Sequence, residues 1–317
     1  MKPWRSIVLL SGGVGGARLL HGLSRVLPAL SEKGAEALTC IVNTGDDFEH
    51  WGLNISPDLD TCMYTLSDLA HEERGWGLAK ESFGALEMMR AYGEDTWFQL
   101  GDRDLGTHIT RTRALRSGET LTQVTARMCK GLGITCRVLP MSDMSCRTMI
   151  DTEGEGTLPF QTWFVRHLAK PKVKAVRFEG DAKAAPGLID AINDAELVII
   201  GPSNPYVSID PIFSLPGVRD AVMARPLVAL SPILGGQAVK GPLGSMIPDL
   251  TGRDPSAGAI ALHYGAPLRG IVVETGDEAS VRNVHSARIL ATQTLMKSRA
   301  DSARLATEIL AFAESLS

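Results

Sequence analysis

The chain has 317 residues, of which 44% are hydrophobic, so it can bury a core of one large or two modest domains and is not disordered. The formal net charge of -4, without a long Lys/Arg block, excludes non-specific binding of nucleic acid. Five cysteines with no C-x-x-C pair, and no apolar stretch near roughly 18 residues, predict a cytoplasmic protein without disulfides, structural zinc or a membrane span.

A glycine loop follows the first predicted strand. The strand covers 5–10 (RSIVLL), the loop covers 11–16 (SGGVGG), and an amphipathic helix covers 17–27. This order is typical of a phosphate site, because glycines admit an anion close to the backbone and the helix start offers N–H groups. The loop is neither a P-loop nor a clean G-x-G-x-x-G, so a tight turn with close helix packing explains it equally well. Arg18 is a candidate phosphate partner or an ordinary solvated arginine.

The second predicted strand, 38–42, delivers an acidic loop over 43–61. This loop contains four aspartates, which are Asp46, Asp47, Asp58 and Asp60. Two strands joined through a helix place their ligand site outside the carboxyl ends of the strands, so the glycine loop and the acidic loop should share one edge. A single aspartate here is more often a helix cap, and Asp58 can be one. Two pairs beside a glycine loop favour a functional site.

The pattern changes to helices from residue 59 to 132, which we interpret as a helical insert. Helices are expected at 61–69, 79–92, 104–117 and 120–130. The motif LGDRD at 100–104 precedes the third helix, either as a start capped by Asp104 with a basic face, or as a site where Arg103 and His108 contact phosphates. Tryptophans 51, 76 and 97 border these loops and either stack on a planar ligand or fill a seam.

The rest of the chain alternates strands with helices and turns. Strands are expected at 134–139, 146–150, 161–165, 172–178, 196–200, 227–230, 270–273 and 287–291, with helices at 186–193 and 300–316. Small and turn residues follow the strands that end at 200 and 230, as in doubly wound sheets around a ligand. Ser203 and Asn204 there either bind a ligand or cap the next segment. The stretch 241–255 is interpreted as a long loop, and such loops are often lids.

Seven motifs in one order extend over most of the chain. They are SGGVGGARLL at 11–20, NTGDD at 43–47, SPDLDTCMYTL at 56–66, GDRD at 101–104, PMSD at 140–143, GPSNP at 201–205 and SPILGGQAVKGP at 231–242. Together they resemble the family of 2-phospho-L-lactate transferases, the CofD family of coenzyme F420 biosynthesis, in its bacterial type.

The resemblance implies an α/β fold in which a Rossmann-like three-layer domain, 1–58 and 133–317, carries a small inserted all-helical domain, 59–132. It also implies that the terminal ribityl hydroxyl of the deazaflavin Fo attacks the phosphorus of a guanylylated phospho-acid, and GMP leaves. The transferred group stays open among 2-phospholactyl, phosphoenolpyruvyl and phosphoglyceryl. We expect Fo and the donor as small-molecule partners of a homodimer, with neither nucleic acid nor membrane involved.

Such a transfer needs in-line positioning and cancellation of phosphate charge, and Mg²⁺ suits it because this ion needs few carboxylates and retains water. The predicted Mg²⁺ ligands come from Asp46, Asp47, Asp58 and Asp60. Asp60 is expected to orient or deprotonate the hydroxyl, and Asp46 and Arg103 complete the predicted catalytic set. The predicted substrate-binding residues are Gly12, Gly13, Gly15, Gly16, Arg18, Asn43, Thr44, Asp47, Thr61, His108, Ser203, Asn204, Ser231 and Gly235.

Two other classes of protein stay open. The first is a CofD-like regulator that binds a nucleotide sugar without catalysis, and the presence of SPDLDT and GDRD favours the enzyme over it. The second is a nicotinamide-dependent oxidoreductase, which predicts an acidic residue roughly 20 residues beyond the glycine loop. Asp46 lies somewhat farther along and is one of a pair, so this class is disfavoured.

Overall fold

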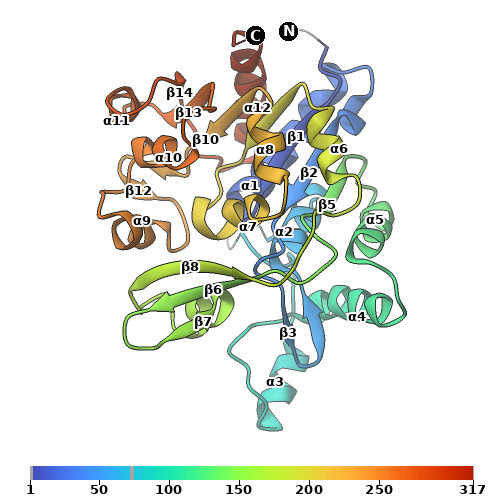
Figure 1. Ribbon diagram of the computed structural model, residues 1–317. Helices are drawn as coiled ribbons and strands as arrows, with labels where there is room; N and C mark the ends of the chain where they lie inside the picture. Colours follow the sequence, from blue (N-terminus) through green and yellow to red (C-terminus); the bar gives the residue numbers. More distant parts are fainter. Residues whose placement is uncertain (1–2, 72–74, 317) are drawn as a thin grey trace.

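The computed structural model describes residues 3–71 and 75–316, and a parallel sheet of seven strands forms its centre (Figure 1). Across the sheet the strands are β14 (Arg288–Thr292), β13 (Gly270–Glu274), β10 (Leu227–Leu230), β9 (Leu197–Ile200), β1 (Ile7–Ser11), β2 (Leu38–Val42) and β5 (Arg137–Pro140). The order of strands along the chain reverses between β1 and β9, as in doubly wound folds, so this gap is where a ligand is expected.

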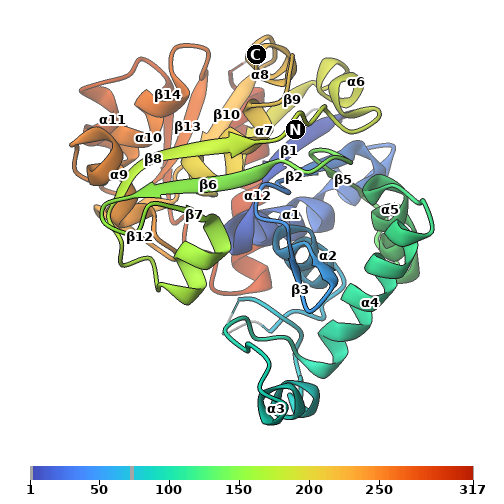
Figure 2. The ribbon, with the colours of Figure 1, turned by 60° about the horizontal axis from the view of Figure 1, so that its bottom comes forward.

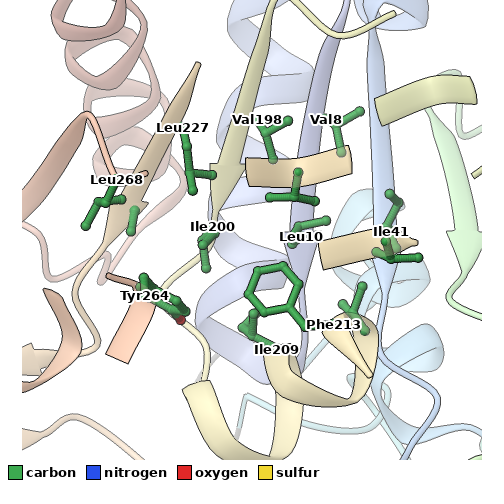
Figure 3. Packing of buried hydrophobic residues seen from close by; sticks show 14 of the residues in the cluster. Val8, Leu10, Ile41, Val198, Ile200, Ile209, Phe213, Leu227, Tyr264 and Leu268 are labelled. Carbon is green, nitrogen blue, oxygen red and sulfur yellow. The ribbon is translucent and has the colours of Figure 1, made fainter. Parts of the chain in front are cut away.

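The sheet is buried on both faces, which explains why its strands are continuous apolar runs. Side chains alternate along β1, so Ile7 and Leu9 enter one core cluster while Val8 and Leu10 enter the other. The first cluster includes α1 (Gly13–Val26) and α12 (Arg299–Glu314). The second includes the helices α6 (Leu188–Asn193), α7 (Asp210–Phe213), α8 (Val218–Met223) and α10 (Ala257–Tyr264). Figure 3 shows part of this cluster, including Phe213 and Tyr264.

A separate antiparallel sheet lies below the seven-stranded sheet in Figure 1. Its strands are β6 (Arg147–Thr152), β7 (Thr157–Pro159) and β8 (Val173–Glu179). The strand predicted at 161–165 is wrong, because Thr162–Arg166 forms a π-helical turn that buries Trp163 against Ile150. The loop predicted at 241–255 is also wrong over most of its length. Helix α9 (Leu243–Thr251) forms there, since Leu243, Met246 and Ile247 recur at helical spacing and are buried.

Within residues 57–71 and 75–131, the structure has four helices close to the predicted positions. They are α2 (Pro57–Leu66), α3 (Gly84–Ala91), α4 (Asp102–Arg116) and α5 (Leu121–Gly131). Buried side chains of α2 and α5, such as Leu59 and Val124, share the core cluster of α1. Helix α3 lies far from the seven-stranded sheet in both ribbon views (Figures 1 and 2). The helical segment is therefore joined to the main core at its two ends.

A hairpin of β3 (Phe48–His50) and β4 (Leu53–Ile55) inside the acidic loop was not predicted. Its rings contact the segment at 97–98, with centroids 4.9 Å apart between Phe48 and Phe98 and 5.6 Å apart between His50 and Trp97. Two of the three predicted loop tryptophans, Trp51 and Trp97, thus belong to a seam of aromatic rings.

The remaining elements are short. They are β11 (Ile233–Leu234), β12 (Gln237–Ala238), α11 (Glu278–Arg282), and single turns at Leu27–Ala29, Gly34–Ala37 and Pro205–Ile209. Within residues 3–71 and 75–316, every helix is too short or too polar to cross a membrane.

The contact between α1 and α12 requires a glycine at position 22. A Cβ atom there would lie 2.1 Å from the carbonyl oxygen of Ser302. We expect Gly22→Ala to lower the free energy of unfolding by about 2 kcal/mol, as overpacking does. Gly106→Ala in α4 is the control, because its Cβ meets nothing within 4 Å, and it should raise stability by up to about 1 kcal/mol. Urea unfolding of both variants measures this; equal effects would contradict the assigned contact.

Candidate functional site

The Asp58 carboxylate joins the loops that follow β1 and β2. Its Oδ1 accepts a hydrogen bond from the Gly13 N–H at 2.7 Å, and its Oδ2 accepts one from Asn43 Nδ2 at 2.9 Å. Gly13 has a φ of +66°, a left-handed conformation that glycine adopts without strain. A Cβ at Gly12 would lie 2.8 Å from Asp58 Oδ2. Glycine at both positions therefore lets the loop close onto this carboxylate.

The loop after β9 contacts the same place. Ser203 Oγ accepts a hydrogen bond from the Gly12 N–H at 3.1 Å and donates one to the Gly12 carbonyl at 2.8 Å. Asn43 Nδ2 also donates to the Val207 carbonyl at 3.2 Å. Three loops thus meet where the strand order reverses, and the prediction that the glycine and acidic loops share one edge is confirmed.

Asp58 is not the N-cap of α2, so the capping alternative for it is wrong. Helix α2 begins at Pro57 with Ser56 in the N-cap position, and the Asp58 side chain turns towards α1 instead. The alternative that Asp104 caps α4 is wrong for the same kind of reason, because Gly101 holds that N-cap position.

Three of the four loop aspartates have a raised pKa. Burial raises the pKa of Asp46 well above its usual range, and the neighbouring Asp58 raises it further. Burial likewise raises the pKa of Asp47, against a hydrogen bond from Ser56 Oγ of 2.6 Å. For Asp58, burial raises the pKa to about 6, although Asn43 and Gly13 both donate to it. Burial removes these carboxylates from water, and the hydrogen bonds that they accept do not fully replace the lost hydration of the ionised form.

The fit of Mg²⁺ follows from this crowding. Asp46 Oδ1 and Asp47 Oδ1 are buried, and neither has a hydrogen-bond partner in the part of the chain that the structure describes. Within residues 3–71 and 75–316, no group of three His, Cys, Asp or Glu side chains is arranged to hold a metal ion. The four aspartates therefore do not form one ligand cluster. Mg²⁺ needs only one or two carboxylates when waters and substrate phosphates supply the rest. The neighbouring Asp46 and Asp58 satisfy that requirement.

Asp60 has a different environment. Both of its carboxylate oxygens accept hydrogen bonds from Arg111 of α4, one of them at 3.1 Å from Nη1. Arg111 is 1% exposed, and His108 Nδ1 lies 3.7 Å from Asp60 Oδ2. Burial lowers the pKa of Arg111, but the contact with Asp60 more than offsets this and raises it. Asp60 is thus a paired carboxylate, unlike its three neighbours.

Several predicted substrate residues make contacts within the protein. Arg18 donates to the Met296 carbonyl, and the exposed Arg103 donates to the Ala79 carbonyl at 2.6 Å. His108 is 2% exposed, which leaves its ring little surface for a phosphate. Thr44 is buried, and its Oγ1 has no hydrogen-bond partner within the described ranges. Gly16 is buried, whereas Gly15 and Thr61 are only partly so.

The residues predicted to hold guanosine lie after β9 and β10. Asn204 caps the turn that follows, accepting from the Tyr206 N–H at 3.0 Å. Ser231 Oγ accepts from the Ile233 N–H at 3.1 Å, and the Gly235 N–H donates to Asp277 at 2.9 Å. Ser203 is therefore the member of this group that the structure joins to the glycine loop.

The sequence reasoning missed Arg111, Asp104 and Tyr64, which surround Asp60 and His108. Asp104, His108 and Arg111 follow one another at spacings of four and three, so they share one face of α4. Two interpretations were left open for this segment, a basic helix face capped by Asp104 and a site where Arg103 and His108 contact phosphates, and neither paired Arg111 with Asp60. The sequence did offer one signal, which was the acidic Asp104 on the same face of α4 as His108 and Arg111.

The protein has an α/β fold with a candidate ligand site at the reversal point of its parallel sheet. The family model described as 2-phospho-L-lactate transferase CofD matches residues 7–309. A phosphoenolpyruvate transferase of Thermobifida fusca is 44% identical over 284 residues, covering 87% of this chain and 88% of that protein. Another from Kitasatospora aureofaciens is 42% identical and covers 97% and 98%. A solved UPF0052-family protein of Bacillus halodurans has a TM-score of 0.66 at 17% identity, covering 98% and 99%.

The chain therefore belongs to the CofD family and is a transferase enzyme of coenzyme F420 biosynthesis. The Bacillus structure, at its low identity, supports the fold alone.

The raised pKa of Asp58 predicts a pH dependence of stability. The carboxyl titrates at about 6 when folded and at 3.8 ordinarily, so from about pH 4 to 6 the folded state holds the extra proton. The free energy of unfolding should then fall as pH rises through this range, by up to about 3 kcal/mol from this group. Urea unfolding with EDTA should show the stability of Asp58→Asn relative to wild type rising from pH 4 to 7. A constant difference would contradict the assignment.

Proposed function

We propose that this chain transfers a phosphoenolpyruvyl group from a guanylylated donor to the ribityl hydroxyl of Fo. The new bond joins the hydroxyl oxygen to phosphorus, the bond from phosphorus to GMP breaks, and the hydroxyl proton is lost. The observation that carries the proposal is the Asp58 junction, which combines a glycine loop and carboxylates at the reversal point of the sheet. The choice of acid rests on the two relatives named phosphoenolpyruvate transferase.

The glycine loop and two arginines are proposed to hold the diphosphate. A helix leaves its first four N–H groups without intrahelical partners, and Asp58 occupies the first of them in α1, at Gly13. The amides of Gly15 and Gly16 in the same turn are the donors we assign to the diphosphate, with Arg18 and Arg103 as cationic partners. Guanosine is assigned to the loops after β9 and β10, through Ser203, Asn204, Ser231 and Gly235.

Asp46 and Asp58 are the residues we assign to Mg²⁺, which would neutralise phosphate charge during transfer. Asn43 and Asp47 hold this loop through hydrogen bonds with Asp58 and Ser56, and Thr44 is assigned to the same site. Asp60 is assigned to the attacking hydroxyl as orienter or general base, because it lies with Asp58 in the first turn of α2, at the helix end that faces the site. We further propose that residues 59–132 act as an inserted helical domain that covers Fo, and that the enzyme is a homodimer.

A mixture of the three candidate donors tests the transferred group. The enzyme is incubated with Fo, Mg²⁺ and equal amounts of the 2-phospholactyl, phosphoenolpyruvyl and phosphoglyceryl donors, and products are identified by mass spectrometry. We expect the phosphoenolpyruvyl product to dominate. A dominant lactyl or glyceryl product would replace the proposed acid, and absence of GMP release with every donor would reject the transfer itself.

Asp60→Asn should reduce turnover by about 10²-fold or more while the protein still binds GDP and Fo, because general acid–base help is lost. The substitution also leaves Arg111 buried without its counter-charge, which should lower the free energy of unfolding by about 3 kcal/mol or more. GMP release and calorimetric binding of GDP measure the two effects. Wild-type turnover in this variant would remove Asp60 from the mechanism.

The Mg²⁺ assignment predicts a stability effect that does not require turnover. Mg²⁺ binds ionised carboxylates, so its addition should raise the melting temperature more at pH 7.5 than at pH 5. The gain should disappear in Asp46→Asn. The matched control is Asp151→Asn in the three-stranded sheet, where the partly exposed carboxylate pairs with Arg177, and this variant should keep the gain. Equal Mg²⁺ effects in both variants would contradict the ligand assignment.

A further inference from the structure

The contact between α2 and α4 is a closed loop of polar side chains. It starts at Asp60, whose two oxygens face the Arg111 guanidinium. Arg111 Nη1 lies 3.4 Å from His108 Nδ1, and His108 Nε2 lies 3.3 Å from Asp104 Oδ2. Tyr64 OH then donates to Asp104 Oδ1 at 2.5 Å. Because Tyr64 stands one turn after Asp60 on α2, the loop returns to the helix where it began.

Every member of this loop is removed from solvent. The side chains of Asp60, His108 and Arg111 are at most 7% exposed, and that of Asp104 is 14% exposed. Burial alone would raise the pKa of Asp104, but its contacts with His108, Tyr64 and Arg111 together lower it. Thr107 Oγ1 also lies within hydrogen-bond distance of Tyr64 OH, at 2.7 Å. The arrangement therefore favours the charged form of Asp104 and places two carboxylates near one buried guanidinium.

Stability alone does not explain such a seam. Removing charges from water costs more free energy than burying apolar side chains of the same size, and replacing buried ion pairs by hydrophobic residues is often neutral or stabilising. Leucines at these positions would join α2 to α4 equally well. The planar guanidinium of Arg111 contacts both carboxylate oxygens and so fixes the carboxylate in one orientation, which leucine side chains cannot do.

We propose that Arg111 is a positioning residue for Asp60. It holds the Asp60 carboxylate in a single orientation at the start of α2, and its Nη1 is itself held by the Asn54 carbonyl and His108 Nδ1, each at 3.4 Å. This inference rests on the proposed transfer to Fo and adds to it the group that orients the carboxylate. Arg111 contacts Asp60 and no substrate in this scheme, so its effect appears in the rate of transfer and not in binding.

Arg111→Lys tests the orientation directly, because lysine keeps the charge but lacks the planar fork. We expect kcat for GMP release to fall at least about tenfold, with KM for the donor and for Fo within about twofold of wild type. The matched control is Arg113→Lys, an exposed position two residues along the same helix, which should retain wild-type kcat. An Arg111→Lys enzyme with kcat within twofold of wild type would overturn the proposal.

A double-mutant cycle tests whether Arg111 acts through Asp60. Asp60→Asn, Arg111→Met and the double variant are compared for kcat and for melting temperature. If the two residues act as one unit, the double variant should be no slower than Asp60→Asn alone. It should also melt higher than either single variant, because each single change leaves one buried charge unpaired. Multiplicative losses of kcat, or a double variant that melts lowest, would contradict the coupling.

The two proposals fail in different ways. Wild-type enzyme that releases no GMP with any donor rejects the transfer, while the melting temperatures of the cycle still test the pair of Arg111 and Asp60. Wild-type enzyme that turns over normally, together with an unaffected Arg111→Lys variant, rejects only the positioning role. If Arg111→Met does not fold, the charge-preserving Arg111→Lys decides the question by itself.

Discussion

One buried carboxylate, that of Asp58, sets the geometry around the ligand site. It lies in the first turn of α2 and accepts a hydrogen bond from the first amide of α1, so two helix N-termini share one negative charge. Asn43 holds its second oxygen from the end of β2. The start of both helices and the ends of both strands are thereby fixed relative to one another, and the loop after β9 joins them through Ser203.

The same carboxylate explains the different states of its neighbours. Asp46 and Asp58 raise each other's free energy when ionised, because both are buried and neither faces a guanidinium. Asp60, two residues farther along α2, turns towards α4 and meets Arg111. The acidic loop thus has two sides. The first, with Asp46 and Asp58, has no guanidinium beside it among the described residues, and on the second the charge of Asp60 is balanced by Arg111. The first suits an incoming cation with its phosphates, and the second suits a fixed group that contacts a hydroxyl.

The sheet was predictable because its strands are buried on both faces, so runs such as LTCIV and LVAL are apolar without interruption. The segment Thr162–Arg166 was not, since its aromatic and β-branched residues suit a strand as well as the π-helical turn that Trp163 completes by tertiary packing. Helix α9 was hidden by the surrounding Gly and Pro residues. Asp58 could be predicted as a site residue because three other aspartates lie close to it in the sequence. Arg111 could not be assigned to Asp60, because it lies 51 residues away and only the folded chain brings the two together.

These features fit a site that gives up stability for binding. A protein selected for stability alone would not bury three under-compensated aspartates beside a helix N-terminus that one of them already occupies. Burial raises the pKa of all three carboxyl groups, and uptake of a proton would lower the repulsion between them. A cation and its bound diphosphate would relieve the same repulsion with the carboxylates ionised, so part of the binding free energy comes from strain that folding leaves in place. Arg111 keeps Asp60 outside that balance, which allows one loop to hold both an adaptable and a fixed carboxylate.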